Sequence, residues 1–248
     1  MEIKLTSTPL RRILKALSVY IEKNRADGIT GNVKWEIKET IRIFGYQQPK
    51  PQIRLCVIQL NENRCSRLHE NRRDFLTDVP SERGIKTAFA GGDILVTVDS
   101  ESDYFTIQNS KLDYNNKRIA GAPKMELRQR YLPMRQCKIK GNIPLRKLWR
   151  FLKLAPAGPV RLRIREDMTR FVSDADKDKC CLNLTEDVDT YLHNEKLEYV
   201  YSLCLLREMM RKFPGDKQVK LFVNDDLIKL QYKLEDNVGH INYYQMSK

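Results

Sequence analysis

The sequence lacks the features that would place it among membrane or secreted proteins. No stretch approaches the roughly 20 consecutive apolar residues that a membrane-spanning helix needs. The first residues, MEIKLTSTPLRR, contain no apolar segment followed by the small-residue cleavage site of a secretory signal. We therefore expect an intracellular protein without a membrane partner.

Cysteine and histidine residues are few and irregularly placed. The six cysteines form no C-x-x-C pair, and the three histidines lie in no metal or nucleophile motif. Adjacent Cys180 and Cys181 should alternate across a strand, with one in the core and the other at the surface. We expect reduced thiols, and we predict no catalytic residue, no metal site and no cofactor.

Charge is abundant and unbalanced. The chain has 45 lysine and arginine residues against 32 aspartate and glutamate residues, which gives a net charge of +13. Such an excess favours polyanionic partners, because each neutralised phosphate releases condensed counterions. The alternative is a basic surface that only keeps the protein in solution. Scattered aromatic residues, with no paired stacking platform, argue against recognition of RNA or single strands.

An internal repeat organises the chain. The segment PLRRILKAL, which begins at Pro9, recurs as PLRKLWRFL at Pro144. Because repeats indicate duplicated structural units, we expect two similarly built halves, each opening with strand, helix and strand. The first strands are predicted at Glu2–Thr6 and Gln136–Lys140, and the extended segments after the helices at Val33–Ile43 and Val160–Val172.

Both repeated segments have the apolar spacing of an amphipathic helix, with a proline in the first turn. The apolar stripes are Leu10, Ile13, Leu14 and Leu17 in the first copy, and Leu145, Leu148, Trp149 and Leu152 in the second. Basic residues occupy the other positions: Arg11, Arg12 and Lys15, then Arg146, Lys147, Arg150 and Lys153. Each helix can therefore pack on a sheet while its cations face outward.

Two further helices and several strands complete the predicted architecture. One helix is expected at Leu197–Phe213, with Arg207, Arg211 and Lys212, and a shorter one at Pro80–Phe89, with Arg83 and Lys86. Alternating or β-branched runs predict strands at Arg54–Leu60, Asp93–Val98, Tyr104–Gln108, Gln218–Val223, Leu227–Leu234 and His240–Tyr244. Many strands and few helices indicate an α+β fold with antiparallel sheets.

The segment between the halves is predicted to be a connector. Residues 119–134 contain Pro123 and Pro133, which argue against regular structure. The connector also carries apolar residues, among them Leu132 and Met134. They either attach it to the sheet or bind a partner.

Several stretches together resemble eukaryotic and archaeal PCNA, the DNA sliding clamp. The opening MEIKL-x5-RRILKALSVYIEK with VKWEIKETIRIFGYQQPKPQIRLCVIQL, the segment CKIKGNIPLRKLWRFLKL, and the ending VKLFVNDDLIKLQYKLEDNVGHINYYQMSK carry the resemblance. It implies an α+β clamp fold of two similar βαβββ-built domains, with antiparallel sheets outside and four basic helices inside. The implied limits are residues 1–118 and 135–248, joined by the connector.

The resemblance implies a non-catalytic function in DNA replication and repair. Three copies would form a homotrimeric ring around double-stranded DNA, bind DNA polymerase and other replication proteins, and be opened by a clamp loader. The expected location is the nucleus if the source is eukaryotic or the protein acts in a eukaryotic host. Cations on the four helices would contact DNA: Arg11, Arg12, Lys15, Arg83, Lys86, Arg146, Lys147, Arg150, Lys153, Arg207, Arg211 and Lys212. Partner peptides would bind at Tyr46, Leu132, Met134, Leu227 and Tyr244. By position, the edges that join subunits would be 115–120 and 180–185.

The chain departs from the family pattern in ways that leave alternatives open. PCNA proteins are usually acidic overall, whereas this chain has a net charge of +13. The tail Gln245-Met246-Ser247-Lys248 differs from the family's tail, beside the implied partner site. One alternative is a clamp-fold protein that binds DNA directly as a monomer or dimer, as herpesvirus processivity subunits do. A DNA enzyme is the other, although no cluster of carboxylates supports it.

Overall fold

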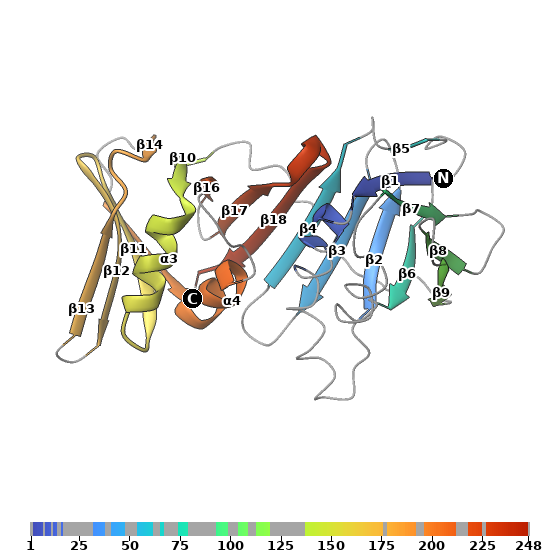
Figure 1. Ribbon diagram of the computed structural model, residues 1–248. Coiled ribbons are helices and arrows are strands. Elements are labelled where there is room, and N and C mark those ends of the chain that lie inside the picture. Colours follow the sequence, from blue (N-terminus) through green and yellow to red (C-terminus); the bar gives the residue numbers. More distant parts are fainter. Residues whose placement is uncertain are drawn as a thin grey trace. The chain divides into compact units, whose positions relative to one another are not determined.

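The computed structural model describes two compact units (Figure 1). The described residues are 2–6, 8–10, 12–13, 16, 32–37, 41–47, 54–61, 65–66, 74–78, 93–98, 104–108, 113–119, 137–175, 178–191, 196–211, 218–224 and 227–247. The first unit contains the described residues from 2 to 47, from 55 to 119 and from 233 to 242. The described residues from 137 to 232 and from 243 to 247 belong to the second. The predicted helix at 80–89 and connector residues 120–134 lie outside the described residues.

The first unit is built from antiparallel strands. Its elements are β1 (Glu2–Thr6), β2 (Asn32–Ile37), β3 (Ile41–Gln47), β4 (Arg54–Leu60), β5 (Cys65–Ser66), β6 (Asp74–Asp78), β7 (Asp93–Val98), β8 (Tyr104–Gln108) and β9 (Asp113–Ile119). The strand order is β5-β1-β7-β8-β9 on one side and β4-β3-β2-β6 on the other. Strand β6 joins them through two residue pairs with β9. Helical residues 8–10, 12–13 and 16 follow β1, and Leu10 and Ile13 are buried there, as predicted.

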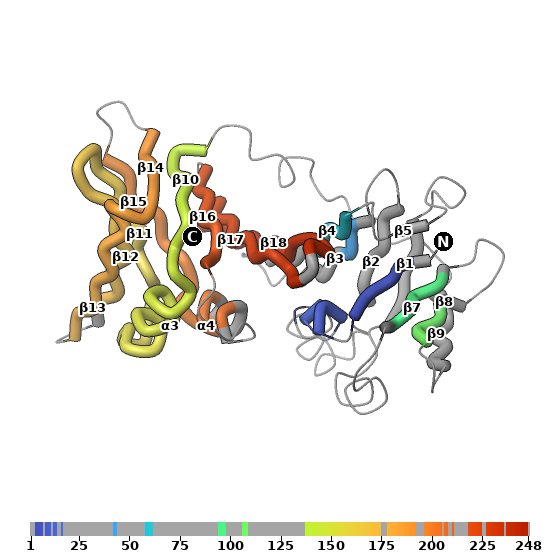
Figure 2. The backbone as a smooth tube through the Cα atoms, turned by 45° about the horizontal axis from the view of Figure 1, so that its top comes forward, coloured from blue at the N-terminus to red at the C-terminus, as the bar shows by residue number. Residues whose placement is uncertain are grey.

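The second unit has two sheets and two helices. Strands β10 (Ile139–Pro144), β14 (Val188–Thr190), β16 (Gln218–Asn224), β17 (Leu227–Lys233) and β18 (Gly239–Met246) are arranged in the order β14-β10-β16-β17-β18. Strands β11 (Pro159–Arg165), β12 (Met168–Ala175), β13 (Asp178–Asn183) and β15 (Leu197–Ser202) form the order β13-β12-β11-β15. Helices α3 (Leu145–Leu154) and α4 (Leu203–Arg211) pack against each other, as Figures 1 and 2 both show.

The core of the second unit follows from strand alternation. In β16, Val219, Leu221 and Val223 are buried, whereas the residues between them are exposed or half-buried. Strands β10 and β17 alternate in the same way around Ile139, Ile143 and Leu230. Apolar residues on one face of each strand therefore build the core, and the polar residues form the opposite face of the sheet.

The two units repeat one pairing scheme. In the first, β1 pairs with β5 and β7, β7 with β8, and β2 with β3 and β6. In the second, β10 pairs with β14 and β16, β16 with β17, and β11 with β12 and β15. Each strand of the first unit thus corresponds to the strand nine positions later, so that β4 corresponds to β13 and β9 to β18.

The structure corrects two sequence predictions for helices. Residues Leu197–Ser202 are strand β15 and not helix, because all six pair with residues of β11. Helix α4 begins only at Leu203. In α3, Phe151 and not Trp149 completes the buried stripe with Leu145, Leu148 and Leu152. The Phe151 ring stacks on Phe171 of β12 with ring centroids 6.0 Å apart, and this contact determines which side of the helix is buried.

Smaller corrections concern strand limits and cysteines. Strand β10 begins at Ile139, and Pro144 ends it, outside the helix. The segment predicted as extended from Val160 to Val172 is a hairpin that turns between β11 and β12. Cys180 is half-buried and Cys181 is exposed, so neither is a core residue. Among the described residues no helix is both long and apolar enough to cross a membrane.

Candidate nucleic-acid interface

Helix α3 presents a row of cations on its exposed side. Arg146, Arg150 and Lys153 are all exposed, and their spacing of four and three residues places them on one face. No described acidic side chain forms an ion pair with any of the three. The Lys153 amine lies 5.3 Å from the ring centroid of half-buried Trp149, which holds it beside the helix. As far as the described side chains extend, the row can therefore meet a polyanion without first breaking an ion pair.

The position of these cations works against the stability of the helix. The N-terminus of a helix carries partial positive charge, so cations in the first turn are unfavourable. Helix α3 has Arg146 and Lys147 there, with no acidic residue and no side-chain cap. Stability alone would place aspartate or glutamate at these positions, so neither cation is explained by an interaction with the helix dipole.

Lys147 differs from its neighbours because an acid partly neutralises it. Its amine lies 2.5 Å from the Asp187 carboxylate, in the turn before β14. The Asp187 carbonyl accepts a hydrogen bond from the Asn142 backbone N–H at 3.0 Å. At Gly141 a side chain would collide with that same carbonyl, so glycine permits the close approach of β10 to this turn. Lys147 thus fastens the start of α3 to the sheet.

Arg207 of α4 binds the end of α3. Its guanidinium donates hydrogen bonds to the Leu152 and Ala155 carbonyls, each at 2.6 Å. These carbonyls belong to the C-terminal end of α3, where partial negative charge favours a cation. Arg207 therefore joins the two helices, and its contact with DNA stays a prediction.

In the first unit, Arg12 is half-buried in an ion pair. Its guanidinium lies 2.5 Å from the carboxylate of Glu235, in the short helix η4 (Glu235–Asn237). The side chains are 18% and 21% exposed, so this pair anchors the N-terminal helical residues to the late segment of the chain. The pair partly neutralises Arg12, and contact of Arg12 with DNA stays a prediction.

The other predicted DNA contacts have no described side chain. Arg11, Lys15, Arg83, Lys86 and Lys212 lie outside the described residues, and for Arg211 only the backbone at the end of α4 is described. Of the twelve predicted cations, the described side chains are those of Arg12, Arg146, Lys147, Arg150, Lys153 and Arg207. The structure brings four of them together on α3.

Two of the predicted partner-binding residues are buried. Leu227 is 7% exposed and Tyr244 is 3% exposed, so both pack within the second unit. Leu132 and Met134 lie outside the described residues, as does the side chain of Tyr46. Burial favours a packing role for Leu227 and Tyr244, and partner binding at this site stays a prediction.

Sequence reasoning missed a lysine that lies among aromatic rings beside these residues. The Lys229 amine lies 5.0 Å from the ring centroid of Phe222 and 5.7 Å from that of Tyr244. Burial lowers the pKa of Lys229, and nearby Cys137 raises it by a smaller amount. Burial likewise raises the pKa of the Cys137 thiol, against the opposing charges of Lys229 and Lys140. The alternation of Phe222 and Lys229 with core residues in their strands was the signal that could have placed them on one face.

The described residues contain no group of three or more histidine, cysteine, aspartate or glutamate side chains that could hold a metal ion. The Asp174 carboxylate, for example, pairs with Arg161 across the hairpin.

Comparison with known proteins shows the fold. No protein-family model and no curated protein matches the sequence. Among solved structures, PCNA from Thermococcus kodakaraensis is 13% identical, with a TM-score of 0.76, and the match covers 100% of this chain and 99% of that one. The PCNA2-PCNA3 complex from Sulfolobus tokodaii gives 13% identity, a TM-score of 0.72 and the same coverage. The chain therefore has the PCNA-type clamp fold, rich in antiparallel sheet with few helices, as the sequence predicted.

Proposed function

We propose that this chain is a DNA sliding clamp, a non-catalytic processivity factor that encircles duplex DNA and tethers replication proteins. The observation that supports it best is the row Arg146, Arg150 and Lys153 on the exposed side of α3 in a PCNA-type fold. Cations without base-reading partners bind the phosphate backbone regardless of sequence, which is the property that sliding requires.

The repeat supports assembly into a ring. The first residues of β18, Gly239–Asn242, belong to the first unit, where β18 lies next to β4 and Gly239 closely approaches Gln59 and Leu60. By the correspondence of strands, β13 and β9 are the equivalents of β4 and β18. Strand β13 is the edge of its sheet and β9 is paired through two residues on its second side. Pairing of β13 with β9 of the next copy would repeat the internal contact head to tail, and three copies would close the ring.

The remaining functional assignments belong to the same proposal. We assign the domain limits 1–118 and 135–248 with connector 119–134, contact with DNA through the basic helices, and capture of polymerase near the connector. A clamp loader would open the closed ring, and the clamp would act where DNA is replicated. The competing proposal is direct binding as a monomer or dimer, which the high net charge favours.

The DNA contact is tested with Arg146→Gln/Arg150→Gln, which removes two exposed charges per chain. The slope of log affinity for duplex DNA against log salt should become shallower by about 0.9 for each phosphate that the variant no longer neutralises. The matched control is Lys140→Gln/Lys220→Gln, which removes two exposed charges on the opposite side of the sheet and should leave the slope near that of wild type. Equal slopes in all three proteins would contradict the assignment of α3.

Ring formation is a separate question with its own measurement. Native mass at micromolar concentration, combined with retention on closed circular against linear DNA, distinguishes the two proposals. A trimer that stays on circles but leaves linear ends is expected for a clamp. A monomer or dimer retained equally by both DNA forms would establish direct binding.

A further inference from the structure

The sheet of the second unit carries a second basic surface, on the face that points away from the core. In the strand register, Lys140 of β10 lies opposite Phe222 of β16, which lies opposite Lys229 of β17. The adjacent row contains Asn142, Lys220 and Gln231. Residues directly opposite in a sheet share a face, so these side chains form one surface, which we call the lysine face.

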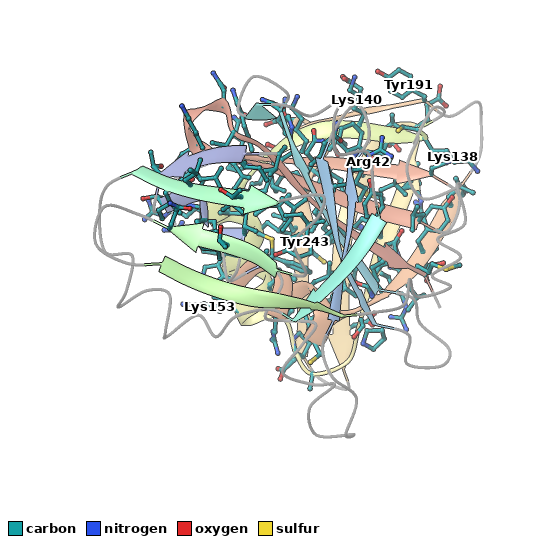
Figure 3. All side chains as sticks on the ribbon, turned by 90° about the vertical axis from the view of Figure 1, so that its right-hand side faces the viewer. Arg42, Lys138, Lys140, Lys153, Tyr191 and Tyr243 are labelled. Atoms are coloured by element: carbon teal, nitrogen blue, oxygen red, sulfur yellow. The ribbon has the colours of Figure 1, made fainter. Side chains whose placement is uncertain are left out.

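The edge of the lysine face continues onto β14. The Lys138 carbonyl accepts a backbone hydrogen bond from the N–H of Tyr191 at 2.8 Å, and Tyr191 is 59% exposed. Figure 3 shows Lys138, Lys140 and Tyr191 near one another and well apart from Lys153 of α3. The lysine face is therefore distinct from the row of cations on the helix.

The described acidic residues compensate little of the charge of this face. Among the described residues Asp189 is the acid that lies opposite Lys140 in the register, and no described acid forms an ion pair with Lys140, Lys220 or Lys229. The other sheet of the same unit is different: Arg161 pairs with Asp174, and Arg163 lies 2.6 Å from Glu198. Among the described residues, neighbouring acids thus neutralise arginines on one sheet, whereas none forms an ion pair with these lysines on the other.

The residues beneath the charges indicate which polyanion fits. A single nucleic-acid strand needs exposed aromatic rings on which bases stack. Here Tyr244 is 3% exposed and Phe222 is half-buried beneath the Lys229 amine, so neither ring among the lysines is open for stacking. Tyr191 is exposed, but it lies at the edge of the face, and a stacked strand needs successive rings along its path. Neighbouring strands lie about 4.8 Å apart, so the backbone positions of Lys140, Lys220 and Lys229 lie within roughly 10 Å of one another. Carboxylates on alternate residues of an extended peptide, about 7 Å apart, match that spacing.

We propose that the lysine face binds an acidic, extended segment of a client protein. The segment would cross β10, β16 and β17 next to buried Leu227 and Tyr244, so that its carboxylates meet the ammonium groups. This deepens the proposed function, since the clients of a clamp would bind here, but peptide binding is measured without DNA. Failure of one proposal therefore leaves the other intact.

The test compares two charge-matched variants with three probes in low salt. The probes are a fluorescein-labelled dodecapeptide of alternating glutamate and serine, the same peptide with glutamine for glutamate, and an oligothymidine of similar length. Lys140→Gln/Lys220→Gln should weaken the glutamate peptide about fivefold, and Arg146→Gln/Arg150→Gln by less than about twofold. The glutamine peptide should bind none of the proteins measurably.

Three outcomes would overturn the proposal. Equal weakening of peptide affinity in both variants would show attraction by net charge alone. Unchanged affinity in Lys140→Gln/Lys220→Gln would remove the lysine face as the site. A larger decrease for oligothymidine than for the glutamate peptide in that variant would make the ligand a nucleic acid. Unchanged melting temperatures, expected for exposed side chains, confirm that the variants are folded.

Discussion

Lys229 combines a cation with partial burial between two aromatic rings, and its ionisation should affect stability. Burial lowers its pKa in the folded protein, while the unfolded chain has the ordinary value near 10.5. Below the folded pKa both states hold the proton. Between the folded pKa and 10.5 the unfolded state binds more protons, so stability should rise with pH across that window.

This prediction is checked by urea denaturation of wild type and Lys229→Met, both in a Cys137→Ala background. The background is needed because the raised pKa of the Cys137 thiol has the opposite effect above its ordinary value of 9.0. The stability of Cys137→Ala relative to Cys137→Ala/Lys229→Met should increase as the pH rises through the lowered pKa of Lys229 toward 10.5. If the difference in the free energy of unfolding does not change with pH, the Lys229 amine has the same pKa in the folded and unfolded protein.

Arg207 links helix α4 to the end of helix α3, and this contact gives a prediction about elements. Arg207→Ala removes two charge-assisted hydrogen bonds to the end of α3 and should lower the free energy of unfolding by about 2 kcal/mol. Arg207→Lys should recover part of this, because it keeps the charge near the helix terminus but cannot reproduce the two-pronged geometry. Exposed Arg150→Ala, the control, should change stability by less than about 0.5 kcal/mol.

The same variants separate a structural role of Arg207 from DNA contact. A structural role predicts that Arg207→Ala lowers stability with little change in the salt dependence of DNA binding, whereas Arg150→Ala does the reverse. If Arg207→Ala flattens the salt dependence as much as Arg150→Ala and leaves urea denaturation unchanged, Arg207 is a DNA contact after all.

Most strands could be predicted from the sequence, and the errors have a common physical cause. Strands β4, β7 and β8 have the predicted limits, because alternation of apolar residues between polar turns is a local signal. Residues Leu197–Ser202 are compatible with either structure, and pairing with β11 decides for strand. Trp149 and Phe151 both fit the helical period, and tertiary contacts such as that of Phe151 with Phe171 decide which is buried.

At the scale of the whole chain, the sequence predicted the repeat and the clamp fold but not the state of each cation. The α3 row follows from local spacing, so Arg146, Arg150 and Lys153 are exposed as expected. Arg12 pairs with Glu235, and Lys147 pairs with Asp187. These partners are distant in the sequence, so no local pattern predicts the pairs. The lysine face likewise requires the register of three strands.

The last prediction concerns assembly through the exposed edge of β13. The Leu184 N–H donates to the Thr169 carbonyl of the neighbouring strand at 2.8 Å. Because donors alternate along an antiparallel strand, the N–H groups of Cys181 and Asn183 point away from β12. They are the donors that pairing with β9 of another copy would use.

Cys181→Pro removes one outward donor and leaves the β12 ladder intact, so it should convert the assembly to monomers of nearly unchanged melting temperature. Cys181 suits this test better than Asn183, whose side chain accepts hydrogen bonds from the Thr185 N–H and hydroxyl at 3.0 and 2.7 Å. Cys181→Ser keeps the N–H and should assemble like wild type in sedimentation velocity at micromolar concentration. A Cys181→Pro protein with the wild-type mass would place the subunit contact elsewhere, and a monomeric wild type would favour direct DNA binding without a ring.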